Sequence, residues 1–350
     1  MRNRQNLPHP ESKGRLSRRT VLGGAAAALA LPLLPASPAA AAAGKMTAGR
    51  FKVTTLSDGH LTLPTTMLAP NVETAAREKA MAAAGQSGAN YRSPLNVTLL
   101  ETDKEKVLLD VGAGTRFMGS AGKLEEALSE TGIEPDQITH VIFTHAHPDH
   151  LWGTINDFDE VAFPAASFHI SETEWNFWMA DDVFTKLDEQ RKAFAVGAQR
   201  NLKAIKDKIQ TFKPGAEILN GLRAIDTSGH TPGHVSFEVG DDKSRVAVLG
   251  DALTHPVISF EYPDWRTAMD QEPDKATATR KRLLDRLSAD KHHIIGYHLP
   301  APGLGRVVRK GNGFAFQPRL VRDSSMLLAI GAPTSTRQFS HSWPVSYWPC

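Results

Sequence analysis

The sequence has almost no cysteine. One cysteine is present among 350 residues, and it stands at position 350. A disulfide within the chain is therefore excluded, and so is a thiolate inside the fold that could bind a metal ion or act as a nucleophile. Any metal site in this chain has to be built from histidine and carboxylate side chains.

A hydrophobic run of membrane-spanning length is also missing near the start of the chain. The apolar stretch 21–34 has about 14 residues and contains Pro32, whereas a spanning helix needs about 20. Basic residues precede this stretch and small residues follow it at 36–43, which is typical of a cleaved signal peptide covering 1–43. The pair Arg18-Arg19 resembles a twin-arginine signal, with an ordinary secretory signal as the alternative. We expect a periplasmic or secreted protein without a stable membrane anchor.

No basic stripe remains once the signal-like segment is set aside. Residues 1–43 hold six of the 40 Lys and Arg residues and one of the 38 Asp and Glu residues. The remainder has 34 basic and 37 acidic residues, a net charge of −3. This balance argues against a nucleic-acid partner.

The pattern of apolar residues predicts one mixed α/β domain over 44–320. Strands are expected at 51–56, 95–100, 106–111, 138–144, 167–170, 234–239, 245–249 and 292–296. Helices are expected at 73–84, 123–130, 172–180, 186–208 and 275–287. The interval 172–214 resembles a helical insertion near the site. The tail 321–350 has weak periodicity, and its order is left open.

The strongest chemical signal is the segment His145-Ala146-His147-Pro148-Asp149-His150. It follows the apolar strand expected at 138–144, and residues two apart on an extended chain point to the same side. His145 and His147 can therefore bind one ion together. Pro148 turns the chain into a short helix, from which Asp149 and His150 can point toward a second ion. A chance cluster of surface histidines is the alternative.

Three further ligand-type residues follow in a consistent order. His230 stands in a Gly- and Pro-flanked loop, Asp251 follows the strand expected at 245–249, and His298 follows the strand expected at 292–296. A lone aspartate at a strand end is more often a cap, and a lone loop histidine is more often solvated. Taken with the cluster at 145–150, the three indicate one shared site.

This ordered set resembles the motif of the metallo-β-lactamase superfamily over roughly residues 50–320. The resemblance implies a four-layer αββα sandwich of the α/β (or α+β) class, with the site along one edge of two sheets. It also implies three sets of ligands: His145, His147 and His230 for one ion, Asp149, His150 and His298 for the other, and Asp251 as a bridge. Asp149 and Asp251 are the expected catalytic carboxylates.

The implied cofactors are two divalent ions, with Zn²⁺ expected and Mn²⁺, Fe²⁺ or Co²⁺ as alternatives. Borderline cations of this kind accept neutral imidazole and carboxylate ligands. Two ions about 3.5–4 Å apart can share one hydroxide, which attacks an ester-type substrate at neutral pH. The second ion neutralises the charge that develops on the oxygen under attack.

Several branches of the superfamily fit poorly. Antibiotic-hydrolysing members lack a bridging aspartate, and one of their classes needs a cysteine ligand. The di-iron redox branch has glutamate at the position of His147 and carries a flavin domain. Glyoxalase II shares the seven ligands but has a basic, helical C-terminal region that is not evident after His298.

The sequence is more similar to the methyl parathion hydrolase-like branch. Shared stretches are 56–59, 145–150, 229–234, 249–251, and His298 followed by Pro302-Gly303. This likeness implies an aromatic substrate pocket formed by Phe117, Trp178 and Phe194, although all three could be ordinary core residues. Trp152 departs from the Gly-Gly common in that branch and could reshape the pocket, and His255 could face the substrate or be solvated.

The sequence therefore predicts a dinuclear hydrolase of small ester-type substrates, most specifically organophosphate triesters or aryl esters. The alternative with the same fold is an acyl-homoserine lactone lactonase or another lactone or thioester hydrolase. A non-catalytic exported metal-binding domain is the third hypothesis. A homodimer is suggested by family analogy alone.

Overall fold

The computed structural model describes residues 44–319. The predicted signal peptide at 1–43 and the predicted tail at 321–350 lie outside the described residues. Within the described range no helix combines the length and apolar character needed to cross a membrane.

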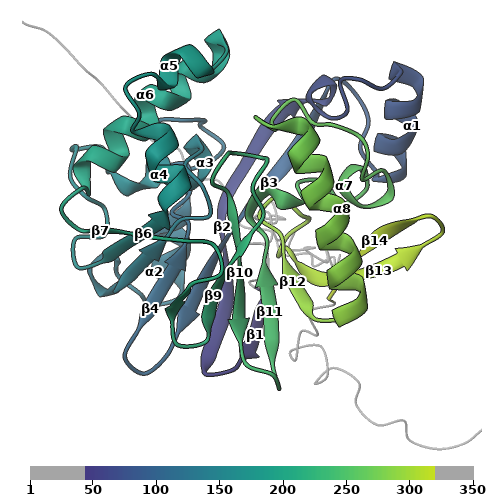
Figure 1. Ribbon diagram of the computed structural model, residues 1–350. Coiled ribbons are helices and arrows are strands. Elements are labelled where there is room, and N and C mark those ends of the chain that lie inside the picture. Colours follow the sequence, from purple (N-terminus) through teal and green to yellow (C-terminus); the bar gives the residue numbers. More distant parts are fainter. Residues whose placement is uncertain (1–43, 320–350) are drawn as a thin grey trace, which may run out of the picture. The chain divides into compact units, whose positions relative to one another are not determined.

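Two sheets form the centre of the domain (Figure 1). The first sheet has its strands in chain order, antiparallel from β1 to β4 and parallel from β4 to β7. Its strands are β1 (Lys45–Ala48), β2 (Phe51–Pro64), β3 (Asn90–Glu101), β4 (Lys106–Leu109), β5 (His140–Ile142), β6 (Ser167–Ser171) and β7 (Ile209–Phe212). Parallel strands need long connections, which here carry helices.

The second sheet also runs in chain order, from β8 to β14. Only the pair β11 and β12 is parallel, and a long helix, α8, connects these two strands. The strands are β8 (Glu217–Leu219), β9 (Leu222–Asp226), β10 (Val235–Gly240), β11 (Arg245–Val248), β12 (His293–Ile295), β13 (Leu304–Lys310) and β14 (Gly313–Pro318).

Helices cover the outer face of each sheet. On the first sheet α2 packs on β2, and α4 packs on β6 and β7, with α6 beside it. On the second sheet α8 packs on β13 and α7 on β14 (Figure 1). Their bounds are α1 (Thr74–Ala83), α2 (Leu124–Glu130), α3 (Pro148–Leu151), α4 (Glu172–Trp178), α5 (Val183–Lys186), α6 (Glu189–Ala204), α7 (Ile258–Glu261) and α8 (Pro273–Asp290). The expected αββα sandwich is confirmed.

Three apolar layers hold these elements together. The middle layer lies between the sheets, with Phe51 and Ile142 from the first and Phe237 and Ile295 from the second. The outer layers join each sheet to its helices, for example Leu284 of α8 against the second sheet. Removing this apolar surface from water supplies about 25 cal/mol per Å² and fixes the sheets against one another.

The strands and helices expected from the sequence are present, with different bounds in several cases. Strands β1, β7, β8, β9, β13 and β14 were not expected, because they are partly exposed and lack a continuous apolar run. One expectation needs correction. The interval 172–214 is helical only as far as 204, and β7 then joins the first sheet parallel to β6. The interval is thus mainly a crossover within the sheet, not an insertion into it.

Candidate metal centre

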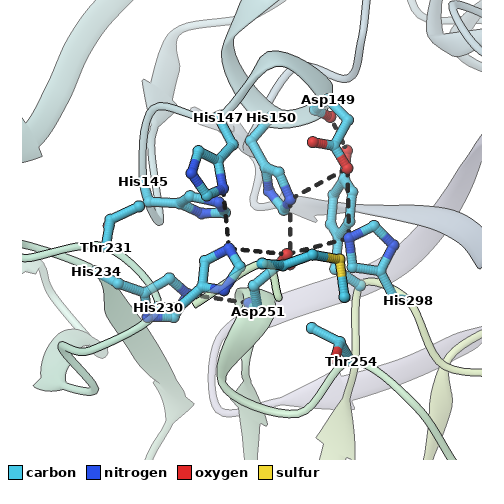
Figure 2. Close-up of polar contacts among 12 residues, drawn as sticks. His145, His147, Asp149, His150, His230, Thr231, His234, Asp251, Thr254 and His298 are labelled. Atoms are coloured by element: carbon cyan, nitrogen blue, oxygen red, sulfur yellow. Dashed lines mark hydrogen bonds and ion pairs between the residues drawn. The ribbon is translucent and has the colours of Figure 1, made fainter. Parts of the chain in front are cut away.

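The seven residues of the expected ligand set meet at one edge of the two sheets (Figure 2). His145 and His147 follow β5, and α3 begins immediately afterwards with Pro148 at its first position, where the missing N–H costs nothing. His230 lies between β9 and β10, Asp251 follows β11 and His298 follows β12. Four of the side chains thus come from the first sheet and three from the second.

The glycine before Asp251 is required by the local backbone. Gly250 has a φ of +52°, and a Cβ there would lie 2.8 Å from Nε2 of His234. A residue with a side chain would be strained and would collide with that ring. Nε2 of His234 in turn accepts the backbone N–H of Asp251 at 2.9 Å. His234 therefore orients Asp251 and is not itself directed at the centre.

Distances between the inner atoms match those expected around shared cations. Nε2 of His230 lies 2.9 Å from Nδ1 of His147 and 3.3 Å from Oδ2 of Asp251. Nε2 of His298 lies 3.1 Å from Oδ2 of Asp251 and 3.3 Å from Oδ2 of Asp149. Two ligand atoms bound tetrahedrally to Zn²⁺ at about 2.0–2.1 Å are roughly 3.3 Å apart. The side chains are thus already spaced as ligands.

Several inner atoms have nothing to bond to within the described part of the chain. Nε2 of His145, Nε2 of His150, Oδ2 of Asp149 and Oδ1 of Asp251 are buried and lack a hydrogen-bond partner among residues 44–319. Nε2 of His150 and Oδ1 of Asp251 are 3.1 Å apart but not aligned as a hydrogen bond. Such a concentration of unsatisfied lone pairs is costly unless a cation accepts them, so these residues fit divalent metal ions.

The outer nitrogen of each ring is held by the protein, which leaves the inner nitrogen with its lone pair. Nδ1 of His150 donates to Oδ2 of Asp110 at 2.8 Å. The hydroxyl of Thr144 donates to the same carboxylate, so its oxygen accepts from Nδ1 of His145 at 3.0 Å. Asp110 adopts a φ of +66°, a left-handed conformation that aspartate tolerates and that directs its carboxylate at both partners.

The remaining rings are oriented in the same way. Nδ1 of His230 donates to Oδ1 of Asp270 at 3.1 Å, and Nδ1 of His298 donates to the carbonyl of Pro94 at 3.0 Å. His147 is turned round, with Nδ1 inward and Nε2 3.3 Å from the side-chain amide of Gln271. Amide oxygen and nitrogen are assigned from their contacts. Exchanging them in Gln271 lets its otherwise unpartnered Oε1 accept from His147.

The carboxylates require positive charge at the centre. Burial opposes ionisation of Asp251, but His298, His150 and His230 outweigh it and hold its pKa well below the usual range. Burial also opposes protonation of His298, but Asp251 and Asp149 outweigh it and raise its pKa to about 10. By contrast, burial and neighbouring imidazoles keep the pKa of His145 well below normal. Protonated imidazoles or divalent cations can supply the charge.

A buried glutamate joins the two loops that carry His147 and His230. Glu174, at the start of α4, accepts the backbone N–H of Ala146 at 2.9 Å and that of Gly233 at 3.0 Å. It also accepts the hydroxyl of Thr231 and the indole N–H of Trp178, both at 2.7 Å. Burial raises the pKa of Glu174 above its usual value, and the four donors offset only part of that rise. This side chain fixes the spacing of ligands that come from different sheets.

A cavity of about 340 Å³ opens onto the centre. Apart from the site residues, most of its wall is apolar: Leu61, Leu63, Pro64, Met67, Phe117, Pro148, Phe194, Ala268 and Met269. Asp188 and Arg191 add charge at the wall, but they form an ion pair of 2.9 Å with each other. Such a space suits a substrate with an uncharged, apolar portion.

Only two of the five expected pocket residues line this cavity, namely Phe117 and Phe194. Trp178 is fully buried with its ring against His147, and it supports that ligand from behind. Trp152 packs edge-on against Phe117, with ring centroids 5.5 Å apart, and is not in the wall. His255 is buried, and its Nδ1 accepts the backbone N–H groups of residues 257 and 258 at the start of α7.

Four supporting residues were not anticipated: Asp110, Glu174, Asp270 and Gln271. The one available signal was the position of Asp110 at the end of an apolar strand. Glu174 bonds to Thr231, which is 57 residues away in the sequence, and Asp270 bonds to His230, which is 40 residues away. No local spacing marks such pairs.

Comparison with known proteins identifies the family. Residues 91–298 match the family model described as the metallo-beta-lactamase superfamily. The chain belongs to the metallo-β-lactamase superfamily. The resemblance noted in the sequence is confirmed at this level, whereas the methyl parathion hydrolase-like branch stays a prediction.

Individual proteins are similar to this chain over part of its length. The uncharacterised protein YobT of Bacillus subtilis is 30% identical over 160 residues, which cover 46% of this chain and 62% of YobT. An N-acyl homoserine lactonase of Bacillus thuringiensis is 22% identical over 224 residues, covering 59% of this chain and 81% of that protein. The solved structure of AidC, a dizinc quorum-quenching lactonase in complex with the product N-hexanoyl-L-homoserine, is 27% identical. It has a TM-score of 0.76 and covers 80% of this chain and 98% of AidC.

Proposed function

We propose that this protein is a two-zinc lactonase that opens the ring of N-acyl homoserine lactones. The observation that carries the proposal is the position of the imidazole and carboxylate cluster in the wall of a largely apolar cavity. Likeness to a dizinc lactonase and to an N-acyl homoserine lactonase supports it. The lactonase was the alternative at the sequence level, and these findings favour it over organophosphate or aryl ester hydrolysis.

We assign the ligands by the groups that the side chains form. His145, His147 and His230 make one group, and Asp149, His150 and His298 make another. Asp251 lies within 3.3 Å of both His230 and His298, and we assign it as the shared ligand. When bound, two zinc ions lower the pKa of water to about 7 and polarise the ester carbonyl. The chain's own part is to hold neutral imidazoles inward and to exclude competing water.

The cavity suits a molecule with a small polar ring and an apolar tail. Phe117 and Phe194 lie edge to face with ring centroids 6.2 Å apart, and Phe194 also meets the ring of His147 at 5.9 Å. An acyl chain laid along this aromatic wall would lose contact with water while the ester end reaches the ligands. Each methylene buried there contributes about 0.8 kcal/mol.

A substrate panel on zinc-loaded protein tests the proposal. We expect hydrolysis of N-acyl homoserine lactones of several chain lengths, followed by proton release, to exceed that of aryl phosphotriesters and aryl esters in kcat/KM. Asp251→Asn serves as the inactive control, because it removes the charge shared by both groups. Faster turnover of the phosphotriesters than of every lactone would overturn the proposal and restore the organophosphate hydrolase predicted from the sequence.

A further inference from the structure

A second cavity lies at the opposite end of the strands that lead to the metal centre. Its volume is about 330 Å³. Strand β11 begins at Arg245 in the wall of this cavity and ends just before Asp251, and β12 begins at His293 in the same wall and ends just before His298. This space, which we call the basic cavity, is therefore separate from the proposed active site.

The wall of the basic cavity is rich in cationic side chains and contains no aspartate or glutamate among the residues that line it. The cationic or titratable members are Lys243, Arg245, Lys291, His292, His293, Arg306 and Arg319. They come from five places in the chain: the turn between β10 and β11, the start of β11, the end of α8 with the start of β12, β13, and the residue after β14. This concentration stands out because the chain from residue 44 onward carries net negative charge.

Most of these charges lack a partner within residues 44–319. Arg245 pairs with Asp242 at 2.8 Å and contacts Glu238 at 3.8 Å. In the same range Lys243, Lys291, Arg306 and Arg319 form no ion pair within 4.0 Å, whereas many other surface Lys and Arg residues of the chain do. Four unpaired cations around one hollow repel each other, and the repulsion is relieved when an anion binds.

The C-terminus of α8 explains the position of only one of the four unpaired cations. Lys291 follows α8, where a cation complements the partial negative charge of the helix C-terminus. Lys243, Arg306 and Arg319 belong to turns and strands and have no such reason to gather. The charges of Arg306 and Arg319 both act on His293 in the same wall: after burial itself, they are the main causes that lower its pKa.

We propose that the basic cavity binds a small anion that carries two or more clustered phosphate groups. Guanidinium groups match phosphate oxygens with paired hydrogen bonds, and lysine adds compact charge. The cations surround a hollow and do not form an extended stripe, which favours a compact anion over a nucleic-acid backbone. The phosphates could belong to a soluble molecule or to a lipid headgroup, and the two sources can be separated by experiment.

Titration calorimetry with pyrophosphate and inorganic phosphate is the direct test. We expect the zinc-loaded protein to bind pyrophosphate more tightly than phosphate. The double variant Lys243→Gln/Arg306→Gln should weaken pyrophosphate binding by about tenfold or more while lactone hydrolysis is unchanged. The matched control is Lys104→Gln/Lys206→Gln, which removes two exposed charges that have no ion pair within residues 44–319. This control should bind as the parent protein does.

Two further experiments separate binding at the basic cavity from binding at zinc, and a soluble anion from a lipid headgroup. Pyrophosphate can also bind zinc, so the titration is repeated on Asp251→Asn, where binding at the basic cavity should persist. Vesicles of phosphatidylcholine with and without cardiolipin, whose headgroup carries two phosphates, test the lipid source. Vesicle binding lost in Lys243→Gln/Arg306→Gln, without pyrophosphate binding, assigns the site to headgroups. Equal losses in both double variants, or no binding to either probe at low salt, would refute the proposal.

Discussion

The role of Glu174 can be tested with one conservative substitution, Glu174→Gln. The change keeps the side-chain shape but replaces one carboxylate oxygen by an NH₂ group. Oε1 accepts from the N–H of Ala146 and the indole of Trp178, and neither of these partners can accept in return. The NH₂ group must therefore face Thr231 and Gly233, which now donate to Oε2.

The magnitude follows from those four contacts. The hydroxyl of Thr231 can rotate and accept from the new NH₂ group, but the N–H of Gly233 is left buried without a partner. An unsatisfied buried donor costs about 1–3 kcal/mol, and the other bonds lose the strength that the charge gave them. We expect the free energy of unfolding of the metal-free protein to fall by about 2–4 kcal/mol. Because Glu174 joins the loops of His147 and His230, zinc affinity should fall about 10- to 100-fold.

Urea unfolding with excess chelator measures the first effect, and competition with a chromophoric chelator measures the second. Trp178→Phe is the matched comparison, since it removes one donor and leaves the carboxylate, and its effect on zinc affinity should be smaller. A Glu174→Gln protein within about 0.5 kcal/mol of the parent, with the same zinc affinity, would refute the reasoning. It would mean that Glu174 is neutral in the fold and does not set the loop spacing.

Three further predictions concern the centre, the pocket and pH. Asp251→Asn should abolish activity and reduce the bound zinc measured by elemental analysis, whereas His234→Ala should retain some activity; equal residual activities would contradict the assignment. Phe194→Ala should lower kcat/KM about tenfold for long-chain lactones and less for short-chain ones, and an equal loss for both would exclude an acyl contact. Burial lowers the pKa of His255 to about 4 in the folded chain, while the unfolded chain binds its proton near pH 6.5. Stability should therefore fall as pH drops from 7 to 5, by about 2 kcal/mol from this group, and urea titrations of His255→Gln should show a correspondingly shallower fall.

The cluster of four side chains at 145–150 could be predicted because its signal is local. His145, His147, Asp149 and His150 lie within six residues, and their directions follow from one strand end and one proline. The residues that orient them gave no such signal. Asp110 reaches His150 across 40 residues, and Glu174 reaches Thr231 across 57, so that only the folded chain reveals the pairs.

The pocket was predicted less well, for a geometric reason. Trp178 and Phe194 are both large aromatic residues of the helical segment after β6, and their residue types do not tell which face of the helix is buried. In the fold Trp178 points inward to Glu174, while Phe194 borders the cavity. Phe117, in the connection between β4 and α2, borders it as well. Residue type thus predicted that aromatic residues gather near the site. It could not predict which of them line the cavity and which pack behind the cavity wall.

The arrangement of the two sheets explains why this fold can hold two charged centres so close together. Each proposed ligand group takes two members from the first sheet and one from the second, so any sliding of the sheets would break both groups at once. The side chains that prevent sliding are apolar and lie in the middle layer, among them Phe51 of the first sheet and Phe237 of the second. The apolar layer fixes the spacing and Glu174 adjusts it locally. The proposed ligand side chains can then keep lone pairs that have no hydrogen-bond partner among residues 44–319.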